Sequence, residues 1–328
     1  MNQARLAGAR LSDRLRNSGF DFSILAPLIA LTVLLVISSL ASEYFLDLRN
    51  LTNIARQVSY TGIIAIGVTF VIIGSGIDLS VGSMVALVGV VLVHTINQFA
   101  DPVQGIIIGL SMAVLSGALF GLINGALVTW GRITPFIATL ATMSIYRSLA
   151  LYFSEAGEMV STNALFPEIG GGYALGLPIP VWTFLIIAVL AHILLAHTPF
   201  GRHLCAVGSS AQVARYLGIR VQRIILVTFV IAGACVGVSS IMLASRLNSI
   251  SPSDAGVFYE LDAIAAVVIG GTALAGGRGS IWGTVLGALI LGVINNMLNM
   301  LGISPYLQGL VKGGVILVAV LMQYKQDR

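Results

Sequence analysis

Apolar residues form long runs along almost the whole chain, separated by short polar segments. A bilayer core of ~30 Å needs ~20 helical residues to cross it, because a helix rises ~1.5 Å per residue. Ten runs can be drawn as spans on this basis, of which the eighth is short: Ile24 to Ser42, Gln57 to Gly76, Ser80 to Ile96, Gly105 to Trp130, Ile133 to Phe153, Val181 to His197, Ile224 to Ser245, Ala263 to Ala275, Ile281 to Leu301 and Tyr306 to Gln323. The pattern therefore predicts an all-α, polytopic transmembrane helical bundle.

The runs fall into two groups of five around the acidic segment 154–180. An odd number of spans per half makes the second half enter the membrane from the opposite face, as in the inverted repeats of transporters. We expect a single membrane domain over residues 1–328, with a tail at 1–23, five spans at 24–153, an outer segment at 154–180 and five spans at 181–323. Two glycine-rich interruptions, at 74–83 and 270–280, look alike but follow different spans of their halves, so they give the repeat little support.

Composition agrees with a membrane protein. Hydrophobic residues make up 57% of the chain and charged residues 9%, which leaves too few polar side chains to cover a soluble core. The basic residues are distributed unevenly. With a cytoplasmic N-terminus, twelve of the seventeen fall inside, namely Arg5, Arg10, Arg14, Arg16, Arg132, Arg202, Arg215, Arg220, Arg223, Arg278, Lys325 and Arg328. Three fall outside, namely Arg49, Arg56 and Arg246, and two lie within spans, namely Arg147 and Lys312. Positive residues favour the cytoplasmic side, so both termini are expected there.

The segment 198–223 is the longest polar stretch of the second half and carries four arginines and no acid. Gly208, Ser209 and Ser210 predict the start of a short helix at Ala211, and Gly218 predicts its end. A short helix between two spans is typical of a segment that another protein holds. The alternative is that the arginines anchor the topology at lipid headgroups.

Asp78 lies in the first glycine-rich interruption, where two spans meet. A carboxylate at membrane depth is a functional candidate, because burying a charge there is costly. It either caps a helix that begins near Leu79 or binds a substrate or an ion.

Polar amides also occur within the apolar runs. Gly117, Gly121 and Gly125 recur every four residues and predict close approach of a neighbouring helix. Asn124 lies beside that ridge. Three further amides form a stripe in the ninth run, namely Asn295, Asn296 and Asn299. These amides are expected to face protein or a water-filled path, and the sequence leaves open whether they touch a solute or a neighbouring helix.

Three acids lie at the expected outer end of the eighth run, namely Asp254, Glu260 and Asp262. They either receive a basic surface of an external partner or complement a helix dipole. The histidines do not have the spacing of a metal pair, so no metal site is expected. The chain also lacks a GxxxxGK[ST] motif and the GxSxG and HExxH signatures, which argues against an enzyme.

Four stretches resemble the ribose-type permeases of bacterial binding-protein-dependent ABC importers for monosaccharides. They are GIIAIGVTFVIIGSGIDLSVGS, GRITPFIATLATMSIYR, FGRHLCAVGSSAQVARYLGI and YELDAIAAVVIGGTALAGGRGSIWGTVLGALILGVINN, and they occur in the family's order between about residues 48 and 323. The resemblance is specific for the family and much less so for the sugar. It implies a type II ABC importer-like fold in the bacterial inner membrane.

The resemblance also implies partners: a second permease, either another copy of this chain or a similar one, a cytoplasmic ABC ATPase that binds ATP and Mg²⁺, and a periplasmic sugar-binding protein. This chain would hold no cofactor, would contact membrane lipid and would bind no nucleic acid. The family's coupling helix maps onto residues 208–218. The residues carried over are Gly208, Ser209, Ala211, Ala214, Arg215, Leu217 and Gly218.

A neutral sugar needs hydroxyls and amides along its path rather than fixed charge. The candidates for path lining are Asp78, Ser80, Ser83, Asn124, Asn295 and Asn299. Two other functions remain open. One is a carrier that works without an ATPase and binds an ion at Asp78, Arg147 or Lys312. The other is a branched-chain amino acid permease, which needs groups that bind a zwitterion.

Overall fold

The computed structural model describes residues 22–304, 307–314, 317 and 321, and they are mainly helical. Its helices are α2 (Phe22–Ala41), α3 (Leu48–Ile73), α4 (Val81–Asn97), α5 (Pro102–Thr129), α6 (Pro135–Phe153), α7 (Phe166–Gly171), α8 (Ile179–His197), α9 (Pro199–Ser209), α10 (Ala211–Tyr216), α11 (Val221–Leu247), α12 (Tyr259–Ile269) and α13 (Ile281–Met300). Four two-residue strands are β1 (Met159–Val160), β2 (Tyr173–Ala174), β3 (Leu177–Pro178) and β4 (Ser249–Ile250). β1 pairs antiparallel with β4, and β2 with β3.

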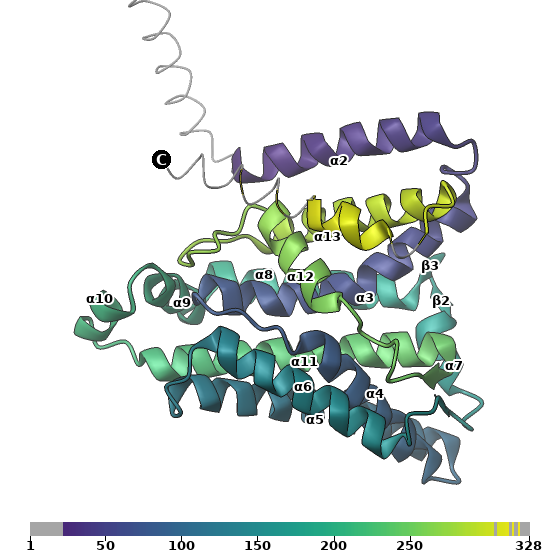
Figure 1. The fold of residues 1–328 in the computed structure, drawn as a ribbon, viewed down its shortest axis with the longest axis horizontal. Helices are drawn as coiled ribbons and strands as arrows, with labels where there is room; N and C mark the ends of the chain where they lie inside the picture. The colour runs from purple at the N-terminus through teal and green to yellow at the C-terminus, as the bar shows by residue number, and fades with distance from the viewer. Residues whose placement is uncertain (1–21, 305–306, 315–316, 318–320, 322–328) are drawn as a thin grey trace, which may run out of the picture.

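The long helices lie side by side along the longest axis of the molecule (Figure 1). α2 and α13 form one side, α5 and α6 form the other, and α3 runs between them (Figure 1). α9 and α10 lie at one end of the bundle, and α7 with β2 and β3 lies at the opposite end (Figure 1). The segments 198–223 and 154–180 are therefore at opposite ends of the molecule.

The glycine ridge of α5 packs directly on α11, as predicted. A Cβ on Gly117 would collide with the carbonyl oxygen of Gly233, and one on Gly121 would collide with the carbonyl oxygen of Phe229. The two helix backbones can approach this closely only because the residues between them are small.

Six described helices are long and apolar enough to cross a membrane: α3, α5, α6, α8, α11 and α13. Residues 25–41 of α2 and the whole of α4 are shorter apolar helices. The expected tenth span, 306–323, lies only partly within the described residues, and residues 307–314 of it are helical.

The eighth predicted run differs from the helix observed. α12 begins at Tyr259, four residues before the predicted start, and ends at Ile269 before a glycine-rich stretch. Its 11 residues span ~16 Å at ~1.5 Å per residue, about half of a ~30 Å hydrocarbon core. α12 is thus a half-length helix inside the bundle.

Candidate functional sites

The segment 198–223 contains two short helices, of which the second was predicted. α10 begins at Ala211, and the side chain of Ser210 accepts a hydrogen bond from Val213 N at 3.3 Å. Gly218 follows the helix with φ +79°, the left-handed conformation that favours glycine. The preceding helix α9 was not predicted. Its signal is the capping Thr198, whose Oγ1 accepts from Gly201 N, followed by proline at the first helical position.

α10 is fixed to the bundle by one face and exposed on the other. Ala214 is only 1% exposed and packs with Val207 and Val221. On the other face the exposed fractions are 55% for Val213, 79% for Tyr216 and 72% for Leu217. Positions i, i+3 and i+4 of a helix lie close together, so these side chains form one apolar surface.

This arrangement corrects the list of expected contacts in α10. Ala214 cannot meet a partner directly because it is buried, and neither can Gly208, which is buried at the end of α9. Ser209, Ala211, Arg215, Leu217 and Gly218 are exposed. The sequence reasoning missed Val213 and Tyr216, which their helical spacing from Leu217 could have indicated.

Gly208 lies at a junction between α9 and the two glycine-rich interruptions. A Cβ on Gly208 would collide with the carbonyl oxygen of Ile73, at the end of α3. Gly277 N donates to the same Ile73 oxygen at 2.9 Å. Ser75 Oγ lies 3.0 Å from the carbonyl oxygens of both Gly208 and Ala275. The two interruptions that look alike in the sequence thus meet beneath the end of α9.

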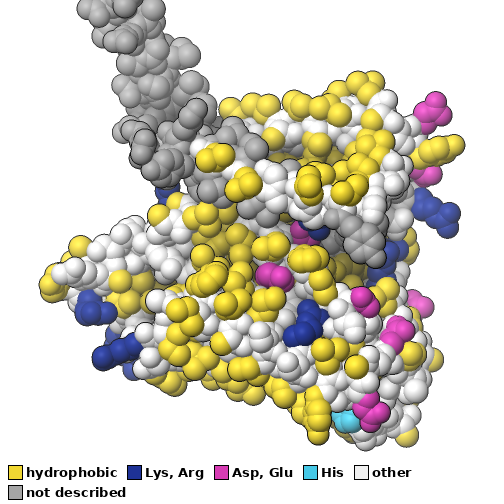
Figure 2. Space-filling view, viewed as in Figure 1, with side chains coloured by type: hydrophobic (Ala, Val, Ile, Leu, Met, Phe, Trp, Pro, Cys, Tyr) yellow, Lys and Arg dark blue, Asp and Glu magenta, His cyan; other side chains and the backbone are white. Residues whose placement is uncertain are grey.

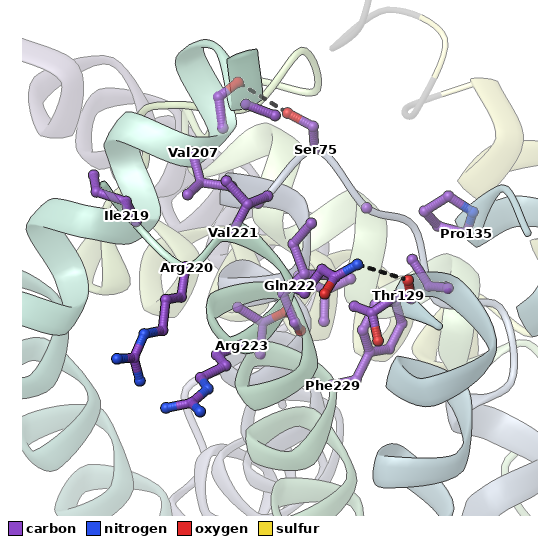
Figure 3. Close-up of a pocket in the computed structure, with 18 of the residues that line it drawn as sticks. Ser75, Thr129, Pro135, Val207, Ile219, Arg220, Val221, Gln222, Arg223 and Phe229 are labelled. Carbon is purple, nitrogen blue, oxygen red and sulfur yellow. Dashed lines mark hydrogen bonds between the residues drawn. The ribbon is translucent and has the colours of Figure 1, made fainter. Parts of the chain in front are cut away.

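A cavity of about 1190 Å³ opens beside this junction, between α9 to α11 and the turn that joins α5 to α6. Figure 3 shows Arg220 and Arg223 extending side by side, while Gln222 reaches the carbonyl oxygen of Thr129. Four arginines line the cavity, namely Arg132, Arg215, Arg220 and Arg223. Among the described residues, no acid lies on its wall. The α10 end of the molecule is therefore strongly basic.

Three of the predicted path residues form one buried cluster with a tyrosine. Asp78 Oδ1 accepts from Ser80 N at 2.9 Å and from Ser80 Oγ at 2.7 Å. Asn124 Nδ2 donates to Ser80 Oγ at 2.7 Å, and Tyr146 OH lies 3.4 Å from Asn124 Oδ1. Asp78, Ser80 and Asn124 are each 0% exposed. The cluster therefore ties the start of α4 to α5 and α6.

The expected cap at Asp78 is only partly correct. α4 begins at Val81, two residues later than predicted, and residues 76–80 before it belong to no helix or strand. Asp78 bonds the backbone of Ser80, the residue that precedes the helix. It thus stabilises the turn into α4 rather than the first amides inside the helix.

The asparagines of α13 have three different environments. Asn295 is buried, its Oδ1 has no hydrogen-bond partner in the described part of the chain, and it lines a small cavity of about 100 Å³. Asn296 Nδ2 donates to Asn50 Oδ1 of α3 at 2.7 Å. Asn299 is exposed and accepts from Gln308 Nε2 at 2.8 Å. Asn295 is thus the member of this stripe that combines an unpartnered polar atom with a place on a cavity wall.

The acids expected at an external surface are mostly inside the molecule. Glu260 and Asp262 are each 7% exposed, and only Asp254 is fully on the surface. Asp262 Oδ2 pairs with Lys312 Nζ at 3.0 Å. Both acids lie in the first turn of the half-length helix α12, which starts within the bundle. Their burial therefore does not support a role in docking an external protein.

Figure 2 shows acidic and basic side chains in a hollow between the side formed by α2 and α13 and the side formed by α5 and α6. Ser83, Arg147 and Glu260 line one cavity of this region, and Asp262, Asn295 and Lys312 line another. Val257 lines both. Ser83 is itself only 2% exposed and lines the first of these two cavities.

The sequence matches a family of membrane permeases, which agrees with the bundle of apolar helices. A family described as "Branched-chain amino acid transport system / permease component" matches residues 50–320. The chain belongs to this family.

Several curated relatives of this permease carry the names of sugar permeases. It is 45% identical to the ribose import permease protein of Bacillus subtilis (strain 168), over 92% of this chain and 93% of the relative. It is 43% identical to the ribose import permease protein of Escherichia coli (strain K12), over 92% and 93%. Identity with the D-allose transport system permease protein of Escherichia coli (strain K12) is 40%, over 92% and 90%. No solved structure matched the permease.

Proposed function

We propose that this chain is the membrane permease subunit of an ATP-driven importer that moves a monosaccharide, a ribose-like pentose or a hexose. The observation that carries the proposal is 40% to 45% identity, over about nine-tenths of the chain, to permeases named for ribose and allose. The family description mentions branched-chain amino acids, but these relatives are named for sugars. As such a subunit, the chain has no enzymatic activity of its own.

The proposed coupling element is α10, with a cytoplasmic ABC ATPase as its partner. An apolar helix face with anchors at i, i+3 and i+4 suits docking into a groove, and Val213, Tyr216 and Leu217 form such a face. Arg215 adds charge beside it. The ATPase would bind the ATP and Mg²⁺, because this chain has no GxxxxGK[ST] motif.

Buried contacts give α10 a way to act on the bundle. Ala214 joins α10 to α9 and α11, and Gly208 joins α9 to the junction at Ser75 and Gly277. When two ATPase domains close on ATP, a displacement of α10 would pass as a rigid movement to both glycine-rich interruptions. Packed elements of this kind switch between arrangements rather than deform continuously.

The proposed membrane arrangement has ten spans in two halves of five, with both termini and α10 in the cytoplasm of a bacterial cell. The separation of the basic α10 end from the segment 154–180 supports this orientation (Figures 1 and 2). A second copy of the permease, a periplasmic sugar-binding protein at the opposite end and membrane lipid complete the proposed assembly. The proposed path runs past Ser83 and Asn295, which line cavities.

The experiment that tests this function is reconstitution with defined partners. The purified chain would be placed in liposomes alone, with a candidate ATPase, and with both the ATPase and a sugar-binding protein. Uptake of labelled D-ribose, D-allose, L-arabinose and D-xylose would be measured beside L-leucine. We expect uptake of at least one sugar only with both partners and ATP. Uptake by the chain alone would instead support the ion-coupled or facilitative carrier, and ATP-driven leucine uptake would support the amino acid branch.

A further inference from the structure

The cavity that contains Ser83 is lined by charged, hydroxyl and aromatic side chains. It has a volume of about 380 Å³ and lies between α4, α6 and the start of α12. Small-molecule sites commonly measure ~300–1,000 Å³, so this volume suits a small ligand. Six of its lining residues carry the argument: Ser83, Ser144, Arg147, Ser148, Phe258 and Glu260.

The depth of the cavity follows from α12. The stretch after α12 reaches Ile73 and Ser75 near the α10 end of the bundle. α12 covers only about half of a ~30 Å membrane core from that end. Glu260, in the first turn, lies at the other end of this helix and is only 7% exposed. A Cβ on Gly82 would collide with Glu260 Oε2, so this carboxylate lies directly on the backbone of α4.

The charged groups of the cavity are held in place but not paired with each other. Arg147 Nη1 donates to the carbonyl oxygens of Pro252 and Ala255, the latter at 2.8 Å. These bonds fix the guanidinium to the turn before α12. Within the described part of the chain, Arg147 and Glu260 line the same cavity without forming an ion pair. A charged residue inside a bundle of membrane-spanning helices usually marks a substrate path.

We propose that this cavity is a transient binding site for a monosaccharide during translocation, an inference that rests on the proposed function. A sugar presents hydroxyls that both donate and accept. Glu260 accepts, Arg147 donates, and the hydroxyls of Ser83, Ser144 and Ser148 do both. The ring of Phe258 offers an apolar face for the C–H side of the sugar.

The three serines also argue for a sugar over an amino acid. Arg147 uses only Nη1 in its two bonds to backbone carbonyls, so Nη2 and Nε remain to donate to a ligand. Three hydroxyls suit a neutral polyol: Ser83 comes from α4, and Ser144 and Ser148 are one helical turn apart on α6.

A filling substitution tests the site with a neighbouring control. Ser144→Trp would place an indole in the cavity, whereas Ile145→Trp would place it on the exposed face of α6, where Ile145 is 52% exposed. In liposomes with the ATPase and the sugar-binding protein, we expect Ser144→Trp to lose sugar uptake while it retains ATP hydrolysis. Ile145→Trp is expected to keep both. Equal uptake by the two variants would overturn the proposal.

A second measurement reads binding directly. In a Cys205→Ser, Cys235→Ala background, Ser148→Cys would be labelled with a charged thiol reagent in the reconstituted complex. We expect a transported sugar to slow labelling and L-leucine to leave it unchanged. No protection by any transported sugar, or protection by L-leucine alone, would overturn the proposal. These results can be distinguished from a failure of the proposed importer function. In that case the unsubstituted complex itself would show no sugar uptake that depends on the ATPase and the sugar-binding protein.

Discussion

Ser75 Oγ lies 3.0 Å from the carbonyl oxygen of Gly208, although the two residues are 133 positions apart in the chain. The same hydroxyl lies 3.0 Å from the carbonyl oxygen of Ala275, 200 positions away. One side chain therefore links α9 to both glycine-rich interruptions. Through α9, the exposed helix α10 is therefore connected by direct contacts to both glycine-rich interruptions of the membrane helices.

The first prediction concerns the close approach at Gly208. Gly208→Ala should lower the free energy of unfolding by ~1–3 kcal/mol, because the added Cβ meets the backbone at Ile73. Ser75→Ala should cost ~1 kcal/mol through the lost hydrogen bond. Both are measured by thermal unfolding in detergent. Gly171→Ala is the control, because a Cβ there meets nothing within 4 Å. Equal melting temperatures for Gly208→Ala and the control would contradict the close contact between Gly208 and the backbone at Ile73.

A second prediction separates structure from transport at Asp78. Asp78→Ala should be strongly destabilising, since each buried polar group left without its partner costs ~1–3 kcal/mol. Asp78→Asn keeps an oxygen that can accept from Ser80, so it should fold better and still support sugar uptake. Thermal unfolding and uptake would be measured on both variants. A stable Asp78→Asn protein without uptake would show that the carboxylate serves a solute or an ion instead.

The ion pair between Asp262 and Lys312 yields a third prediction. Lys312→Met leaves the largely buried carboxylate of Asp262 without its counter-charge, which should cost ~3–5 kcal/mol of folding free energy. Adding Asp262→Asn should recover much of that loss because the uncompensated charge is removed. A double-mutant cycle of unfolding free energies measures the coupling. Strictly additive losses would mean that the two side chains do not interact as the structure shows.

Features with a local cause could be predicted from the sequence. Ser210 caps α10 and Gly218 follows it, and the pattern of Gly117, Gly121 and Gly125 predicts the close packing of α5. The amide Asn124 was expected to face protein or a water-filled path, and it hydrogen-bonds Asp78 and Ser80 within the bundle.

Features set by distant contacts were missed. Glu260 and Asp262 have the pattern of exposed acids at a helix start, and only the neighbours Gly82 and Lys312 show that they are buried. Ala214 resembles a contact residue of α10 until the packing of Val207 and Val221 is known. In both cases the burial depends on contacts with residues elsewhere in the fold, which the hydropathy of the local sequence does not reveal.

The central claim is that α10 couples this permease to an ATPase, and one comparison of two variants tests it most directly. Leu217→Asp puts a charge on the apolar face of α10, and His203→Asp puts the same charge at an exposed position of α9. ATPase association and ATP-driven sugar uptake would be measured for both in liposomes. We expect Leu217→Asp to weaken association ~10- to 30-fold, as loss of a buried interface anchor does, and to reduce uptake. His203→Asp should be close to wild type. Wild-type association and uptake for Leu217→Asp would contradict the account.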